Sequence, residues 1–380
     1  MTKSRECSIM IKQLQAIRAI AALAIVLIHV TSGQAAVSES VFLVNQLLRF
    51  ASPVFVLMAG MVLTHVETAR PSPSVGSFYR IRFLKVLVPY AIWSLFYFAY
   101  ESRYWMYEGD LAGIWHRFTG LFPGQLLTGT AFIHLYFILI MVQLYALFPL
   151  LYRWLERHAA SLVAAALTLS AAMNGLIYLH QLHVLVLPSL PLTYVTLFPG
   201  WLFYFVLGMA AMRHEDKWRA AMVRRPAAAV IGLSCWAGAF LLMQFDGKWS
   251  QTYGLVLKPS VMLYAAASFV VLYMAVYSVR PRPWVNRLYA PLEKIAAHSF
   301  LIYLAHPFCL NVIVKGSKWL GKQQVFYGAG GLMLLMALTL AATWAGIRII
   351  RRLPFAVWLG APRRLKGTRP DARVEFGAKG

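Results

Sequence analysis

The sequence predicts an all-α, polytopic transmembrane bundle of about ten membrane-spanning helices with both termini in the cytoplasm. Of its 380 residues, 60% are hydrophobic and only 13% are charged, whereas about one quarter of a soluble domain is charged. The apolar residues gather in repeated runs that are long enough for a helix to cross a bilayer. Basic residues stand between these runs and concentrate at alternate ends, as expected of a multi-pass membrane protein.

Each apolar run of roughly 20 residues predicts one span. We expect a single transmembrane domain over 1–360. The basic segment 361–380 contains Gly and Pro and has little to bury, so we expect a disordered cytoplasmic tail. The predicted spans are 13–33, 43–65, 86–102, 132–152, 159–179, 195–212, 227–245, 255–278, 296–314 and 327–349.

The distribution of charge predicts the orientation of these spans. If the N-terminus is cytoplasmic, every cytoplasmic loop is basic and the opposite loops are sparse in charge, so the alternation holds along the whole chain. An N-terminal signal peptide is a competing interpretation of the first span, but many hydrophobic segments follow it. The basic residues of the cytoplasmic loops are Arg70, Arg80, Arg82, Lys85, Arg153, Arg157, Arg213, Lys217, Arg219, Arg224, Arg225, Arg280, Arg282, Arg287 and Lys294.

Composition also argues against several classes of function. The net charge of +23 is spread between apolar segments, which favours contact with anionic lipid over binding of nucleic acid. The cysteines, Cys7, Cys235 and Cys309, lie far apart, so neither a disulfide framework nor a metal site is indicated. No Asp or Glu falls in the middle of a predicted span, which disfavours an ion-coupled transporter.

The first span carries Arg18 and His29 at the two ends of the unbroken apolar run 19–28. At about 100° per residue, both side chains point to nearly the same side of a helix, roughly 16 Å apart along its axis. Lipid is unfavourable for such a pair, so we expect it to face protein or a water-filled cleft. On this pair alone, a snorkelling arginine and an ordinary interfacial histidine remain an alternative.

A second basic group, Arg80, Arg82 and Lys85, precedes the third span. On a helix, Arg82 and Lys85 are neighbours three residues apart, whereas Arg80 points elsewhere. Guanidinium and ammonium groups suit phosphate, so these residues could form a cationic clamp at the cytoplasmic face. Charge alone favours the simpler interpretation, an anchor that follows the positive-inside rule.

Polar residues also gather towards the predicted outer side. The ninth span carries polar side chains at i, i+4 and i+7, which implies helix packing or a cavity. Its serine and histidine are about two turns apart, which excludes a hydrogen-bonded serine–histidine dyad along this helix. A histidine beside aromatic residues at the start of span four is more often part of an aromatic belt than a ligand. The candidates on this side are Arg49, His134, Tyr136, Ser299, Tyr303 and His306.

In their order and placement, these motifs resemble the acyltransferase 3 family of integral membrane acyltransferases across most of the chain. The resemblance rests on Arg18 with His29, Arg49 before the segment 53–60, and Arg82-x-x-Lys85, and it continues through 134–137 and 299–306. The sequence departs from the family at Ala59, where serine is common, and at Tyr136, where tryptophan is common. Lys85 replaces a frequent second arginine and cannot bind phosphate in a bidentate way. The extracytoplasmic domain fused to some members is missing.

The resemblance implies a bacterial inner-membrane O-acyltransferase that moves an acyl group, often acetyl, from cytoplasmic acyl-coenzyme A to an extracytoplasmic glycan. It implies catalytic roles for His29 and Arg18, and coenzyme A phosphates held by Arg82, Lys85 and Arg80, without a metal. The expected partners are the glycan acceptor, membrane lipid and proteins of polysaccharide synthesis, with no nucleic acid. The residues expected at the substrate are Arg49, His134, Tyr136, Ser299, Tyr303 and His306.

Two other functions remain compatible with a ten-span bundle that has basic inner loops. One is a transporter or flippase for a glycan, and the other is a non-catalytic assembly factor in polysaccharide synthesis. A flippase has no need for an arginine and a histidine at the two ends of one span, so this pair favours the enzyme. The sequence leaves open the acceptor, the identity of the acyl group, the choice between direct transfer and an acyl-enzyme, and the oligomeric state.

Overall fold

The computed structural model describes residues 2–103, 109–223, 226–279 and 283–362. In these ranges the chain forms α-helices and short 3-10 turns, without β-strands. The α-helices are α1 Thr2–Ser32, α2 Glu39–Leu47, α3 Ala51–Ala69, α4 Val75–Glu101, α6 Leu111–Thr128, α7 Tyr136–Gln181, α8 Leu202–Arg213, α9 Glu215–Met222, α10 Pro226–Ser250, α11 Pro259–Tyr277, α12 Pro283–Trp319 and α13 Gly328–Ile350. The 3-10 turns are η1 Leu48–Phe50, η2 Tyr194–Thr196, η3 Phe198–Gly200, η4 Gln323–Phe326 and η5 Ala356–Leu359.

The helices account for the ten predicted spans. Eight described segments are long and apolar enough to cross a bilayer, with α2 and α3 counted together. One of them, α7, has 46 residues and is interrupted at His158, whose φ of −143° and ψ of 56° are not helical, so it covers spans four and five. The shorter apolar helix α8 covers span six after two 3-10 turns. The polytopic helical bundle is therefore confirmed.

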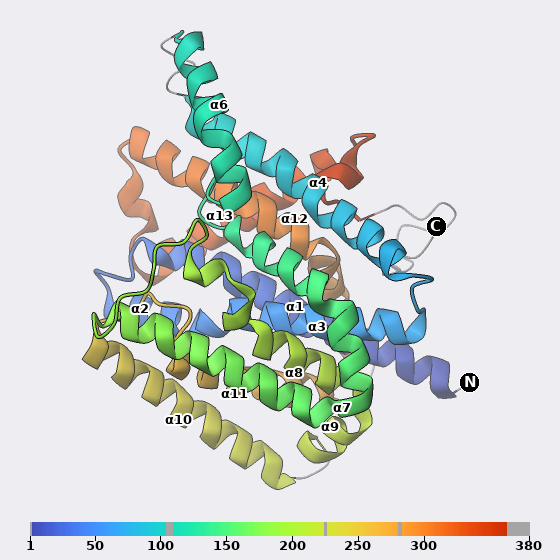
Figure 1. The fold of residues 1–380 in the computed structure, drawn as a ribbon. Helices are drawn as coiled ribbons and strands as arrows, with labels where there is room; N and C mark the ends of the chain where they lie inside the picture. Colours follow the sequence, from blue (N-terminus) through green and yellow to red (C-terminus); the bar gives the residue numbers. More distant parts are fainter. Residues whose placement is uncertain (1, 104–108, 224–225, 280–282, 363–380) are drawn as a thin grey trace.

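Two boundaries differ from the prediction. The helix α4 begins at Val75, well before the predicted start of span three, because the Ser74 hydroxyl accepts a hydrogen bond from the Ser77 amide (3.1 Å) and caps the helix. The basic group therefore lies on the helix and not in front of it. The predicted loop between spans three and four contains α6, which is capped by Asp110 and has no buried residue. This helix projects away from the bundle (Figure 1).

The helix α1 occupies the middle of the bundle (Figure 1). It packs against α2, α3, α11, α12 and α13, and Ile17, Ala21 and Val26 on it are completely buried. The pair α3 and α8 lies beside it, and α10 runs along the edge of the bundle with little of its surface covered. The helix that carries Arg18 and His29 is therefore surrounded by protein.

The chain after α13 returns to the bundle. The turn η5 packs on α4, where the Trp93 indole donates a hydrogen bond to the Leu359 carbonyl (3.1 Å). Ala361 is also buried, so packing extends slightly past the predicted domain end at residue 360. Most of the predicted tail, 363–380, lies outside the described residues.

Candidate active site

Arg18 lies near the middle of α1, where it shares a neighbour with Arg82 of α4. The Arg18 guanidinium lies 5.9 Å from the centre of the Phe55 ring on α3, and Tyr145 of α7 lies near enough to Arg18 and Arg82 for their charges to act on its hydroxyl. Arg82 is partly buried, with its guanidinium 5.8 Å from the Phe78 ring. Four helices thus converge on a cationic cluster, which consists of Arg18 and Arg82 around Tyr145.

The two other predicted members of this group lie differently. Arg80 and Lys85 are exposed on α4, whereas Arg82 is partly buried. The exposure of Arg80 agrees with the prediction that Arg80 points elsewhere. Lys85 is also exposed, so it does not share the inward side of α4 with Arg82. Of the predicted phosphate clamp, Arg82 is the member that has Tyr145 as a neighbour in common with Arg18.

The C-terminal half of α1 brings His29 to His306 of α12. Their ring centres are 5.2 Å apart and the rings are tilted by 51°. The ring of His134, just before α7, lies 6.0 Å from that of His306. Among the described residues these histidines do not form a metal-ligating group. We call His29, His134 and His306 the histidine cluster.

Aromatic residues hold the histidine cluster in place. The Tyr303 hydroxyl donates a hydrogen bond to the His134 carbonyl, and its ring lies 5.0 Å from the His134 ring. The Tyr97 hydroxyl of α4 donates to the Leu304 carbonyl of α12 (2.7 Å), and its ring meets the His134 ring edge-on at 5.2 Å. The segments from α4, α7 and α12 are therefore fixed to one another around His134.

Asn45 is a residue of this site that the sequence analysis missed. Its amide nitrogen donates to the Ile28 carbonyl (3.1 Å) and to the Thr31 hydroxyl (2.8 Å), so α2 is tied to the turn of α1 that carries His29. Asn45 is 3% exposed. A lone asparagine within the apolar run of span two was the available signal, because such a residue in a membrane helix needs a partner.

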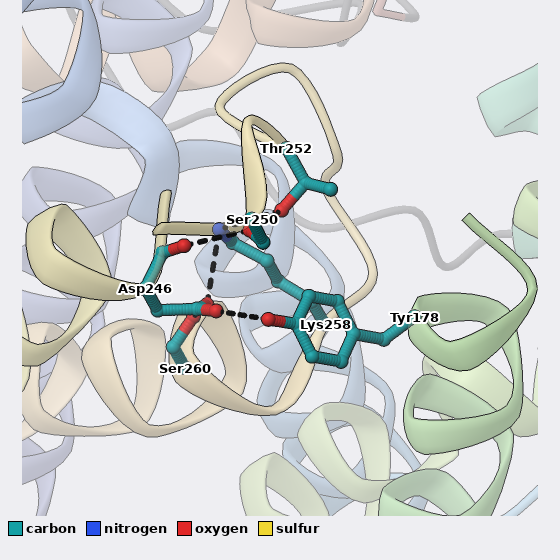
Figure 2. A network of polar contacts seen from close by, with 6 residues as sticks. All are labelled: Tyr178, Asp246, Ser250, Thr252, Lys258 and Ser260. Carbon is teal, nitrogen blue, oxygen red and sulfur yellow. Dashed lines mark hydrogen bonds and ion pairs between the residues drawn. The ribbon is translucent and has the colours of Figure 1, made fainter. Parts of the chain in front are cut away.

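A buried ion pair fixes the loop between α10 and α11. The Lys258 ammonium lies 3.0 Å from the Asp246 carboxylate and 3.3 Å from the Thr252 hydroxyl. Asp246 also accepts hydrogen bonds from Tyr178 and Ser260 (Figure 2). Burial lowers the pKa of Lys258 from its ordinary value, and the Asp246 carboxylate opposes that shift. The sequence analysis missed this pair because the predicted span seven ends just before Asp246.

Arg49 binds the loop that this ion pair fixes. Its guanidinium donates a hydrogen bond to the Gly254 carbonyl (3.1 Å) and interacts electrostatically with the phenol of Tyr136. Tyr136 lies in turn near Tyr303 of α12. Arg49 and Tyr136 therefore adjoin the aromatic side of the histidine cluster. Ser299 is fully buried, and its hydroxyl has no hydrogen-bond partner among the described residues.

The fold and these two clusters define a polytopic membrane protein whose central helix carries a guanidinium near its middle and an imidazole near its C-terminal end. A family model for an acyltransferase domain, that of the acyltransferase 3 family, matches residues 11–351. The chain belongs to this family and is a membrane acyltransferase, which confirms the resemblance found in the sequence. Comparison with curated proteins and with solved structures gave no match.

Proposed function

We propose that this protein transfers an acyl group, acetyl in the simplest case, from cytoplasmic acyl-coenzyme A to a hydroxyl of an extracytoplasmic glycan. Its place is the inner membrane of a bacterium, with the N-terminal end of α1 in the cytoplasm and Arg18 nearer to that side than His29. The observation that carries the proposal is the pairing of Arg18 with the cationic cluster and of His29 with the histidine cluster on one central helix.

The cationic cluster fits the phosphates of coenzyme A. Arg18 and Arg82 supply planar guanidinium groups, which bind phosphate oxygens in a bidentate way. Partial burial reduces the competition of water for these groups. The alternation of basic loops predicts that Arg18 lies nearer than His29 to the cytoplasm, where acyl-coenzyme A is made. Lys85 and Arg80 are exposed on α4, so we assign them a weaker contribution to the same phosphates.

The histidine cluster fits the acyl-transfer step. The separation of Arg18 and His29, roughly 16 Å along the helix axis, is similar in scale to the pantetheine arm of coenzyme A. His29 takes the proton of the acceptor hydroxyl as that oxygen attacks the thioester carbonyl. The new carbon–oxygen bond forms, the carbon–sulfur bond breaks, and the proton passes from His29 to the departing thiolate. Direct transfer of this kind needs no acyl-enzyme.

The negative charge that develops on the carbonyl oxygen needs a donor nearby. The sequence left Arg49 and His134 as candidates. Arg49 donates to the Gly254 carbonyl, whereas the ring of His134 is buried within the histidine cluster. This favours His134 as the oxyanion donor and Arg49 as a residue that shapes the acceptor side with Tyr136.

The proposal is tested with purified protein, by measuring coenzyme A release from acetyl-coenzyme A in the presence of glycan acceptors. We expect His29→Ala to lower the rate by about 10²- to 10⁴-fold, the usual contribution of a general base. His116→Ala is the matched control, because His116 is exposed on α6 and should leave the rate unchanged. Normal acyl transfer by the His29 variant at equal protein level would overturn the proposal.

A further inference from the structure

His306 is fully buried. The mechanism proposed above, in which His29 alone acts as general base and general acid, gives His306 no role. His306 lies on α12, is 0% exposed, and its ring faces that of His29 at 5.2 Å. The next residue, Pro307, has no N–H and removes one hydrogen bond from the helix at this point. A buried imidazole at such a position needs an explanation, because unpaired polar groups are costly inside a membrane protein.

The hydrogen bonding of His306 fixes which nitrogen carries its proton. The Nδ1 atom lies 2.9 Å from the Ile302 carbonyl oxygen. A carbonyl can only accept, so Nδ1 must be the donor, and in the neutral ring Nε2 is left as an acceptor. This Nε2 is buried and has no hydrogen-bond partner among the described residues. His306 therefore keeps one free acceptor atom inside the histidine cluster.

His29 is the neighbouring group best placed to donate a hydrogen bond to Nε2 of His306. The titratable groups whose rings contact His306 are His29 of α1, His134 before α7 and Tyr303 of α12 itself. Tyr97 of α4 lies behind His134, whose ring it contacts. Both tyrosine hydroxyls already donate to backbone carbonyls. The two other histidines can donate an N–H to Nε2, and His29 is the nearer by ring centres.

We propose that His306 is a positioning residue that accepts a hydrogen bond from His29 and stabilises the imidazolium that forms there during acyl transfer. The bond orients one nitrogen of His29 towards the acceptor hydroxyl and the other towards Nε2. In soluble enzymes a carboxylate commonly has this position beside a catalytic histidine. A neutral imidazole does the same without placing an anion in the bilayer, where burial of charge is expensive.

This inference rests on the proposed function for its kinetic consequence, but it has a second readout that does not need catalysis. Without His306 the imidazolium of His29 loses a hydrogen bond, so His29 gives up its proton more easily. The acidic limb of the pH–rate profile should then move to lower pH by about one unit, and the plateau rate should fall about tenfold, the usual effect of one hydrogen bond to a charged group. A variant that only damages packing lowers the rate without moving the profile.

The experiment compares the wild type with His306→Ala and His306→Gln. The amide oxygen of glutamine can also accept a hydrogen bond, so His306→Gln should recover part of the rate and of the profile that His306→Ala loses. His298→Gln is the matched control. His298 lies on the same helix, its Nδ1 contacts the carbonyl four residues earlier at 2.8 Å, and its ring packs on Trp344 instead of another histidine.

The second readout is the pH dependence of His29 modification by diethyl pyrocarbonate, followed by mass spectrometry of the α1 peptide. We expect the same shift of about one unit in His306→Ala, and none in His298→Gln. Profiles that stay unchanged in both His306 variants would overturn the pairing, even if acyl transfer is confirmed. A shifted modification profile in a protein that releases no coenzyme A would instead overturn the proposed function and leave the pairing standing.

Discussion

Arg80 and Arg82 are two residues apart on α4, and this small separation puts them in different surroundings. Arg80 is exposed, whereas Arg82 is partly buried beside Phe78 and interacts with Tyr145, as Arg18 does. A charged group that is partly shielded from water binds a phosphate more strongly than one in full contact with solvent. The two arginines therefore differ in their expected contribution to coenzyme A binding, although they are chemically identical.

We expect Arg82→Ala to weaken coenzyme A binding at least about tenfold, because one charge-assisted hydrogen bond contributes about 1.5–3 kcal/mol. Arg80→Ala is the matched control on the same helix and should change the affinity less than about twofold. Isothermal titration of the detergent-purified protein with coenzyme A measures both. Equal losses in the two variants would mean that net charge, and not the cationic cluster, determines binding.

Spacing alone predicts that Arg18 and His29 share one side of a helix, but it does not predict their neighbours. Helical periodicity places Arg18 and His29 on one side of α1 from the sequence alone. It contains no information on which distant helix meets that side, so the contact of His29 with His306 could not be derived from it. The partners of Asn45, and the pairing of Lys258 with Asp246, could not be derived for the same reason, because they lie on other segments of the chain.

At the scale of elements, α3 and α8 approach each other so closely that glycine is needed at the contact. A Cβ atom added to Gly60 would lie 2.1 Å from the Phe205 carbonyl oxygen, and one added to Gly208 would lie 2.0 Å from the Leu57 carbonyl oxygen. The two helices therefore use reciprocal glycines to bring their backbones together, a common way for membrane helices to associate. Because α3 packs on α1, the spacing of α3 and α8 affects the cationic cluster through Phe55 of α3.

We expect Gly60→Ala to destabilise the protein by about 1–3 kcal/mol, because the obstructing atom is backbone and cannot move to another rotamer. Thermal unfolding in detergent measures this as a lower midpoint. Gly238→Ala on α10 is the matched control, because its added Cβ would meet nothing within 4 Å. The same midpoint for both variants would show that α3 and α8 can separate without cost.

Element boundaries show what hydropathy can and cannot predict. The apolar runs predicted every span, because a bilayer imposes a minimum length of apolar helix. They did not predict that α4 begins at Val75, since the capping serine Ser74 lies in a polar segment outside the run. Nor did they predict α6, whose apolar residues are exposed in the structure and form no span.

At the scale of the whole molecule, the orientation of the bundle decides whether the two clusters can serve the proposed reaction. Acyl-coenzyme A is confined to the cytoplasm, so the cationic cluster must open to that side and the histidine cluster must lie nearer the opposite side. The alternation of basic loops predicts this orientation. It is the one requirement of the mechanism that concerns all of the helices together.

Cysteine labelling tests the orientation in a variant whose three native cysteines, Cys7, Cys235 and Cys309, are replaced by serine. In spheroplasts, a membrane-impermeant maleimide should label Val186→Cys, a site that is 87% exposed after α7. It should label Arg70→Cys, exposed between α3 and α4, only after permeabilisation. The reverse pattern would place Arg18 and Arg82 on the side without coenzyme A. The cationic cluster would then have to bind a different anion, and the donor assigned here would be wrong.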